Sequence, residues 1–127
     1  MNLEFQESSK FQKDLKHLDS TEAKRVVRAI AKMGQHLELD RASLFQMTDQ
    51  PRVMKLLDGL DSTLYVMKVQ GNKHLRIIFT LDDDPLFDRM IFTLLRVVHH
   101  DNLDKTYLQV AQSLYRGMMD ESAASHE

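Results

Sequence analysis

The sequence predicts an α+β domain: a short N-terminal strand, a helical hairpin, an antiparallel three-stranded meander and a C-terminal helix. Leu3 and Phe5 alternate with polar neighbours, as in a first strand. Apolar residues three and four positions apart then predict two helices, over about 9–18 and 20–37. Three runs rich in β-branched and aromatic residues predict strands at about 64–70, 74–81 and 87–98.

The two predicted helices begin at residues that favour N-caps. Ser8 and Ser9 precede the first helix, and Asp19, Ser20 and Thr21 precede the second, with Glu22 in its first turn. The apolar stripe of the first helix contains Phe11, Leu15 and Leu18, and that of the second contains Val26, Ile30, Met33 and Leu37. Lys24, Arg28 and Lys32 lie four residues apart on the opposite side of the second helix. These features predict an antiparallel helical hairpin.

The segment from Leu64 to Thr80 reads as a β-hairpin around a polar turn at residues 71–73. Each predicted strand carries one cation, Lys68 in the first and Arg76 in the second. A cation amid apolar residues needs either solvent or an anionic partner. The third predicted strand ends in the imidazole pair His99-His100. These residues are the first candidates for a functional site.

The remaining segments complete a single predicted domain over residues 1–120. Residues 38–51 are predicted to be irregular or a short helix, and the Asp58-Gly59 turn signal precedes the meander. A final amphipathic helix is predicted from about Asp104, with Tyr107 on its apolar stripe. Residues 121–127 are predicted to be a frayed tail.

Composition narrows the function classes. The chain has 127 residues, no cysteine, a net charge of −2 and a pI of about 6.3. These values exclude a disulfide framework and thiolate chemistry, and they argue against a generic nucleic-acid-coating protein. With no apolar run of membrane-spanning length and no signal peptide, a cytoplasmic protein is expected. Residues 1–37 nevertheless hold seven Lys/Arg against five Asp/Glu, so a local basic face is expected.

Four segments in this order resemble the RelE/ParE superfamily of bacterial toxins from toxin–antitoxin pairs. They are Lys55-Leu-Leu-Asp-Gly59, similar to the family's K-x-L-x-G; Leu64-Tyr-Val-Met-Lys-Val69, similar to L-Y-E-L-R-V; Leu75-Arg-Ile-Ile-Phe79, similar to Y-R-I-I-F; and Val97-Val-His-His100, similar to V-x-H-R. The resemblance covers roughly residues 2–107.

The resemblance implies a function. RelE-type members are ribosome-dependent endonucleases that cut mRNA without a metal or other cofactor, and a small antitoxin protein neutralises them. The corresponding catalytic roles would fall on Lys68, Arg76, His99 or His100, and Tyr107. The stripe Lys24, Arg28 and Lys32, together with Lys73 in the hairpin turn, would contact RNA. Two alternatives remain within the same fold: a ParE-like inhibitor that binds DNA gyrase, and a catalytically inactive interaction module.

The chemistry of RNA cleavage assigns these roles. An arginine suits the phosphate because guanidinium is always charged and binds phosphate bidentately. Lysine suits a second phosphate contact or a base, and imidazole suits an acid or base near neutral pH. Alternation along a strand predicts that His99 and His100 point to opposite faces, so that at most one lies with Arg76. His100 is preferred because parity groups it with Arg96 on the polar side.

Each residue also has a purely structural interpretation. Lys68 and Arg76 would be solvated or paired with the acidic run Asp82–Asp84, and the basic helix stripe would be a solvated face. The histidines would be polar strand-end residues, and Tyr107 would belong to the core. Metal binding by His99, His100, Asp101 and Asp104 is not expected, because their spacing matches no standard site. The chain also departs from the family pattern in carrying His-His instead of His-Arg and a longer spacing to Tyr107.

Overall fold

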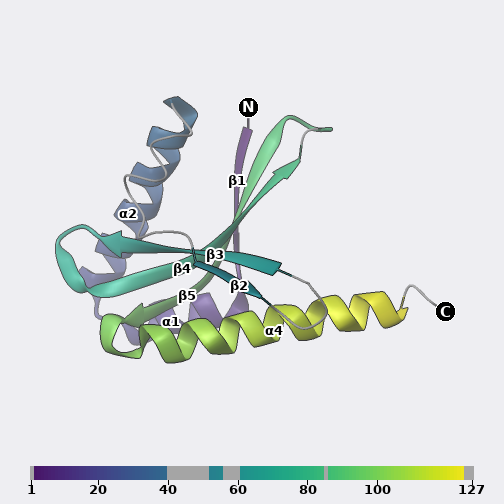
Figure 1. Cartoon of the computed structure of the whole chain (residues 1–127). Coiled ribbons are helices and arrows are strands. Elements are labelled where there is room, and N and C mark those ends of the chain that lie inside the picture. The colour runs from purple at the N-terminus through teal and green to yellow at the C-terminus, as the bar shows by residue number, and fades with distance from the viewer. Residues whose placement is uncertain (1, 40–51, 56–60, 85, 125–127) are drawn as a thin grey trace.

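A computed structural model describes residues 2–39, 52–55, 61–84 and 86–124 (Figure 1). The elements are β1 (Asn2–Glu7), α1 (Ser9–His17), α2 (Ser20–Leu39), β2 (Arg52–Lys55), β3 (Asp61–Val69), β4 (Asn72–Asp84), β5 (Arg89–His99), the 3₁₀ turn η2 (His100–Asn102) and α4 (Leu103–Ala124). This arrangement confirms the predicted α+β fold. The predicted segment 38–51 and the Asp58-Gly59 turn lie, apart from residues 38 and 39 at the end of α2, outside the described residues.

The strands form one sheet in the order β1-β5-β4-β3-β2. Strands β3, β4 and β5 pair antiparallel, which confirms the predicted meander. Strand β1 pairs with β5 in parallel, with Leu3 opposite Met90 and Phe5 opposite Phe92. The sheet is therefore mixed. The short strand β2, which pairs antiparallel with β3, was not among the predicted strands.

Two apolar clusters pack on opposite faces of the central strands. One lies under α1 and α2 and includes Phe11, Val26, Met33, Met67, Ile77, Phe79 and Phe92. The other lies under α4 and includes Leu64, Val66, Ile78, Val98, Tyr107 and Ala111. Neighbouring residues such as Ile77 and Ile78 are thus both fully buried, one on each face. Burial on both faces explains why these strands read as nearly continuous apolar runs.

The starts of the two N-terminal helices agree with the sequence. The hydroxyl of Ser8 accepts a hydrogen bond from the backbone N–H of Phe11 at 3.1 Å, so Ser8 is the N-cap of α1. At α2, the N–H of Glu22 donates to the Asp19 carboxylate at 2.8 Å, and the N–H of Asp19 donates to Glu22 at 3.2 Å. This reciprocal pair satisfies two backbone donors that the helix itself leaves without partners.

A β-bulge at Leu95 changes which residues at the end of β5 point to each face of the sheet. Ile78 pairs with Arg96 and Phe79 with Leu94, so Leu95 is the extra residue. The bulge is bound to the start of α1: the Ser8 hydroxyl donates to the Leu95 carbonyl at 2.8 Å. As a result Leu94 and Val97, three residues apart, both pack in the cluster under α1 and α2.

Helix α1 also binds the strand just beyond the bulge. The Asp14 carboxylate accepts from Nε of Arg96 at 2.7 Å and from the backbone N–H of Val97 at 2.9 Å. Both side chains of this ion pair are largely buried. Arg96 is therefore paired with α1. Bonds from Leu95, Arg96 and Val97 to α1 and its N-cap residue hold the end of β5 in place.

The C-terminal helix is longer than predicted. It continues to Ala124, so residues 121–124 are helical although they were assigned to a frayed tail; residues 125–127 lie outside the described part. Among the helices described, none is both long and apolar enough to span a membrane.

Replacement of Ser8 by alanine tests the link between α1 and the bulge. The variant loses both the N-cap bond and the bond to the Leu95 carbonyl, so the free energy of unfolding should fall by about 1–2 kcal/mol. Ser9→Ala is the matched control, because Ser9 is exposed and lies inside the first turn. Urea unfolding of both variants measures the difference. Equal stability of the two would contradict Ser8 as the cap.

Candidate functional site

The two predicted strand cations lie side by side. Lys68 of β3 is the register partner of Arg76 of β4, and on the other side Arg76 pairs with Val98 of β5. Directly opposite residues of antiparallel strands share a face, so both cations extend the α4 face of the sheet beyond its apolar cluster. Lys68 is exposed and Arg76 half-buried. The structure therefore brings these two candidates together.

The Arg76 guanidinium is oriented by its own strand. Its Nη1 donates to the carbonyl oxygens of Lys73 at 2.8 Å and Leu75 at 2.9 Å. Asp82 lies six residues further along the same strand, about 20 Å away at 3.3 Å per residue, which is beyond the reach of an arginine side chain. The Asp82–Asp84 run lies at the other end of β4, where Asp84 is the register partner of Arg89.

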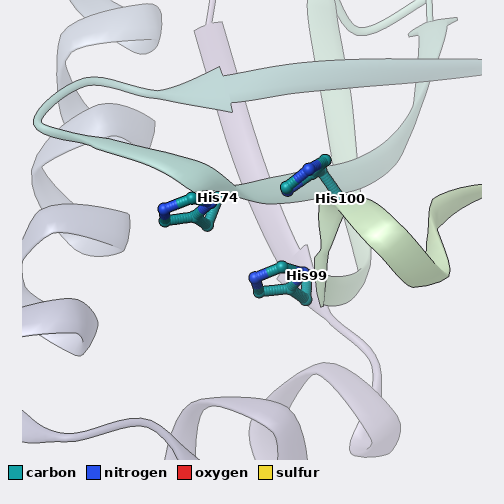
Figure 2. A group of neighbouring side chains, drawn as sticks. All are labelled: His74, His99 and His100. Carbon is teal, nitrogen blue, oxygen red and sulfur yellow. The ribbon is translucent and has the colours of Figure 1, made fainter.

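Three imidazoles gather where β4 begins and β5 ends (Figure 2). The ring centroids of His99 and His100 are 4.7 Å apart, and those of His74 are 5.3 Å from His99 and 5.4 Å from His100. The His74 and His99 rings are nearly parallel, with an angle of 7° between their planes. All three side chains are exposed. We refer to them as the histidine cluster.

The prediction that His99 and His100 point to opposite faces was wrong. Strand β5 ends at His99, and His100 opens the 3₁₀ turn η2, so strand alternation no longer applies between them. The pairing of Leu75 with His99 also brings the preceding residue of β4, His74, beside the turn. The parity argument that grouped His100 with Arg96 fails as well, because Arg96 is bound to Asp14 of α1.

Asp101 contacts two members of the histidine cluster. Its carboxylate lies 3.3 Å from Nδ1 of His99 and 3.0 Å from Nε2 of His100. Its backbone N–H also donates to Nδ1 of His99 at 3.3 Å, so this nitrogen is an acceptor. The tight η2 turn thus places the Asp101 carboxylate where it contacts both rings.

Basic side chains line two adjoining hollows beside the β3–β4 turn. The first, about 420 Å³, is lined by Arg25, Arg28, Ala29, Lys32, Gln70 and Gly71. The second, about 670 Å³, is lined by Arg25, Lys68, Val69, Gly71, Asn72, Lys73 and His74. Arg25 and Gly71 line both, so the two hollows adjoin each other at these residues. We call the cations Arg25, Arg28, Lys32, Lys68 and Lys73 the basic surface.

Helix α2 is bound directly to the hairpin turn beneath the basic surface. Nη1 of Arg25 donates to the Gly71 carbonyl at 2.6 Å, and Nζ of Lys32 donates to the Gln70 side-chain oxygen at 2.8 Å. Gly71 has a φ of +87°, a conformation that only glycine adopts readily. The turn thus brings the cations of α2 beside those of the β3–β4 hairpin, some forty residues away in the sequence.

The remaining candidates divide between the surface and the core. Arg28, Lys32 and Lys73 line the hollows, whereas Lys24 is exposed on α2 and lies outside both linings. Tyr107 is only 5% exposed and packs with Leu64, Val66 and Ile78 under α4. It therefore lies in the core, as its place on the apolar stripe indicated.

Two residues of the site were missed in the sequence. Arg25 follows the helical spacing 25, 28, 32 as well as Lys24 follows 24, 28, 32, so periodicity alone could not choose between them. His74 lies two residues before Arg76, on a strand whose register with β5 no local pattern reveals. The sequence does not predict a metal site at His99, His100, Asp101 and Asp104; in the structure, His74 joins His99 and His100 in a group of three imidazoles.

Comparisons with protein-family models, with curated proteins and with solved structures find no match for this chain.

Replacement of Gly71 tests how the turn supports the basic surface. Gly71→Ala places a Cβ at positive φ and about 3.4 Å from Nε of Arg25. The strain should lower the free energy of unfolding by about 1–2 kcal/mol. Gly71→Asn is the matched control, since asparagine tolerates this conformation better, and it should lose less. Thermal unfolding of the two variants measures the order, and a larger loss for Gly71→Asn would contradict it.

Proposed function

We propose that this chain is an RNA endonuclease that works as the toxin of a toxin–antitoxin pair, similar to RelE-type proteins. The observation that carries the proposal is the continuity between the basic surface and the histidine cluster: His74 lines the same hollow as Lys68 and Lys73. Cations that bind a polyanionic backbone thus adjoin groups able to transfer protons.

The basic surface suits RNA because of its shape and charge. Cations from α2 and from the β3–β4 hairpin line two adjoining hollows, on a protein whose net charge is −2. Local concentration of positive charge attracts phosphates even when the whole protein is mildly acidic. Positive charge that several side chains supply along a surface is one of the features by which proteins bind single strands.

The cleavage step needs a base, an acid and a cation at the phosphate. A base removes the proton of the ribose 2′-hydroxyl, the 2′-oxygen forms a bond to phosphorus, and the bond to the 5′-oxygen breaks as an acid protonates that oxygen. The products are a 2′,3′-cyclic phosphate and a 5′-hydroxyl. Arg76, beside Lys68, is assigned to the charge that grows on the phosphate oxygens. His100 or His99 is assigned to proton transfer.

The ribosome and the antitoxin enter the proposal through the sequence resemblance. The strand cations, the terminal histidines and the order of elements are the features that resemble RelE-type proteins, and those proteins cut mRNA in the ribosomal decoding site. Tyr107 is not assigned a catalytic role, because only 5% of it is exposed. The two alternatives, a gyrase inhibitor and an inactive interaction module, become outcomes of the first experiment below.

Induced expression in a bacterial host tests the reaction. The wild-type chain should stop protein synthesis promptly and leave mRNA fragments with 5′-hydroxyl ends. Arg76→Ala should lower the cleavage rate about 100-fold or more, as expected for loss of one transition-state contact. Lys13→Ala, which removes an exposed cation of α1, is the matched control and should cut normally.

Two results of that experiment would overturn the proposal. Intact mRNA with an SOS response would favour a gyrase inhibitor, and normal growth with soluble, folded protein would favour an inactive interaction module.

Salt dependence of RNA binding tests the basic surface separately from catalysis. The double variant Arg28→Ala/Lys32→Ala, made in an Arg76→Ala background, should bind a single-stranded RNA more weakly. The slope of log K against log salt should become shallower by about 1.4, since each phosphate contact to a single strand contributes roughly 0.7. Lys24→Ala in the same background should leave the slope unchanged, because Lys24 lies outside the two hollows. Equal changes in both variants would refute this assignment of the surface.

A further inference from the structure

We propose that His74, His99 and His100 bind a divalent transition metal ion of the zinc class through three imidazole nitrogens. One ligand atom from each residue lies within 4.8 Å of the others, and the three rings face one another (Figure 2). The proposal concerns metal binding itself and stands whether or not the chain cleaves RNA.

Small side-chain movements would complete the coordination. In a tetrahedral zinc site with Zn–N bonds near 2.0–2.1 Å, the nitrogens are separated by about 3.4 Å. The nitrogens must therefore approach by about 1.4 Å from their 4.8 Å limit. His99 at the end of β5 and His100 at the start of η2 have 44% and 42% of their side chains accessible, which leaves room for rotation about their side-chain bonds.

Asp101 supplies an independent indication of a metal site. Metal-binding histidines commonly direct their second ring nitrogen to a carboxylate, which sets the tautomer and increases the basicity of the ligand nitrogen. The Asp101 carboxylate contacts Nδ1 of His99 and Nε2 of His100. A ring N–H at Nε2 of His100 directed to Asp101 leaves Nδ1 of that ring with a lone pair for the metal, whereas Nδ1 of His99 accepts from the backbone N–H of Asp101.

The ligand set defines the class of ion. Imidazole nitrogens suit zinc, copper and nickel, whereas magnesium and calcium prefer oxygen ligands. Three protein ligands leave a fourth tetrahedral position for water or an anion, as in catalytic rather than structural zinc sites. Lys68 and Lys73 line the hollow that His74 also lines, so their charge favours an anion at that position.

Metal binding has a consequence for the proposed reaction, and this consequence rests on the proposed function. A ring nitrogen that coordinates a metal has no lone pair with which to accept a proton. Zinc would then inhibit RNA cleavage, and a chelator would restore it. Because binding is measured on the protein alone, failure of the nuclease proposal and failure of the metal proposal give different results.

Titration with Co²⁺ tests the site directly, because four-coordinate Co²⁺ absorbs strongly in the visible range and six-coordinate Co²⁺ does not. The full chain, without an affinity tag that binds metals, should give intense visible bands at one Co²⁺ per chain, and added Zn²⁺ should abolish them. His74→Ala, His99→Ala and His100→Ala should each eliminate the bands. Asp101→Asn should lower the Co²⁺ affinity about tenfold, as for loss of a partner that orients a ligand.

The matched control removes the other three histidines of the chain, His17, His36 and His126, by substitution with alanine. This triple variant should keep the bands and the stoichiometry of the wild type. Absence of the bands in the wild-type chain, their survival in His74→Ala, or their loss in the triple control with folded protein would overturn the proposal.

Discussion

Helices cover both faces of strands β3, β4 and β5, and this double burial determines where polar side chains lie. Successive residues such as Ile77 and Ile78 belong to opposite apolar clusters, so a charge in the middle of these strands needs a partner, as Arg96 has in Asp14. Lys68 and Arg76 occupy the end of the meander, where the apolar cover stops. Among the described residues, the groups that the proposed function uses lie at the β3–β4 turn and the end of β5.

The position of the histidine cluster depends on how β5 is held. The bulge at Leu95 shifts the in-and-out alternation of side chains along β5. Asp14 of α1 and its N-cap residue Ser8 bind the strand at and beyond the bulge. These bonds set the register in which Leu75 pairs with His99, and that register brings His74 to the η2 turn. A helix on one side of the sheet thus determines which imidazoles meet at its end, although it contributes no side chain to the cluster.

The basic surface and the histidine cluster share His74, and the two proposals use different properties of the same groups. Proton transfer in RNA cleavage uses an imidazole lone pair, and so does coordination of a metal. The nearby lysines attract the phosphate of RNA in one case; in the other they attract an anionic fourth ligand but repel the metal cation itself. Binding of RNA and binding of metal are therefore expected to compete at this site.

The order of the helices and of the other strands, the helix caps and the antiparallel meander could be predicted from the sequence, because these depend on local periodicity and on side chains a few residues apart; the short strand β2 was not predicted. The sequence also identified Lys68, Arg76 and the terminal histidines, since charge within apolar strands is visible in any register. It could not determine the parallel pairing of β1 with β5, the bulge at Leu95 or the contribution of His74. Likewise, only the docking of α2 against Gly71 shows that Arg25 lines the two hollows and that Lys24 does not. These features were decided by the tertiary structure, because each depends on pairing between segments far apart in the chain.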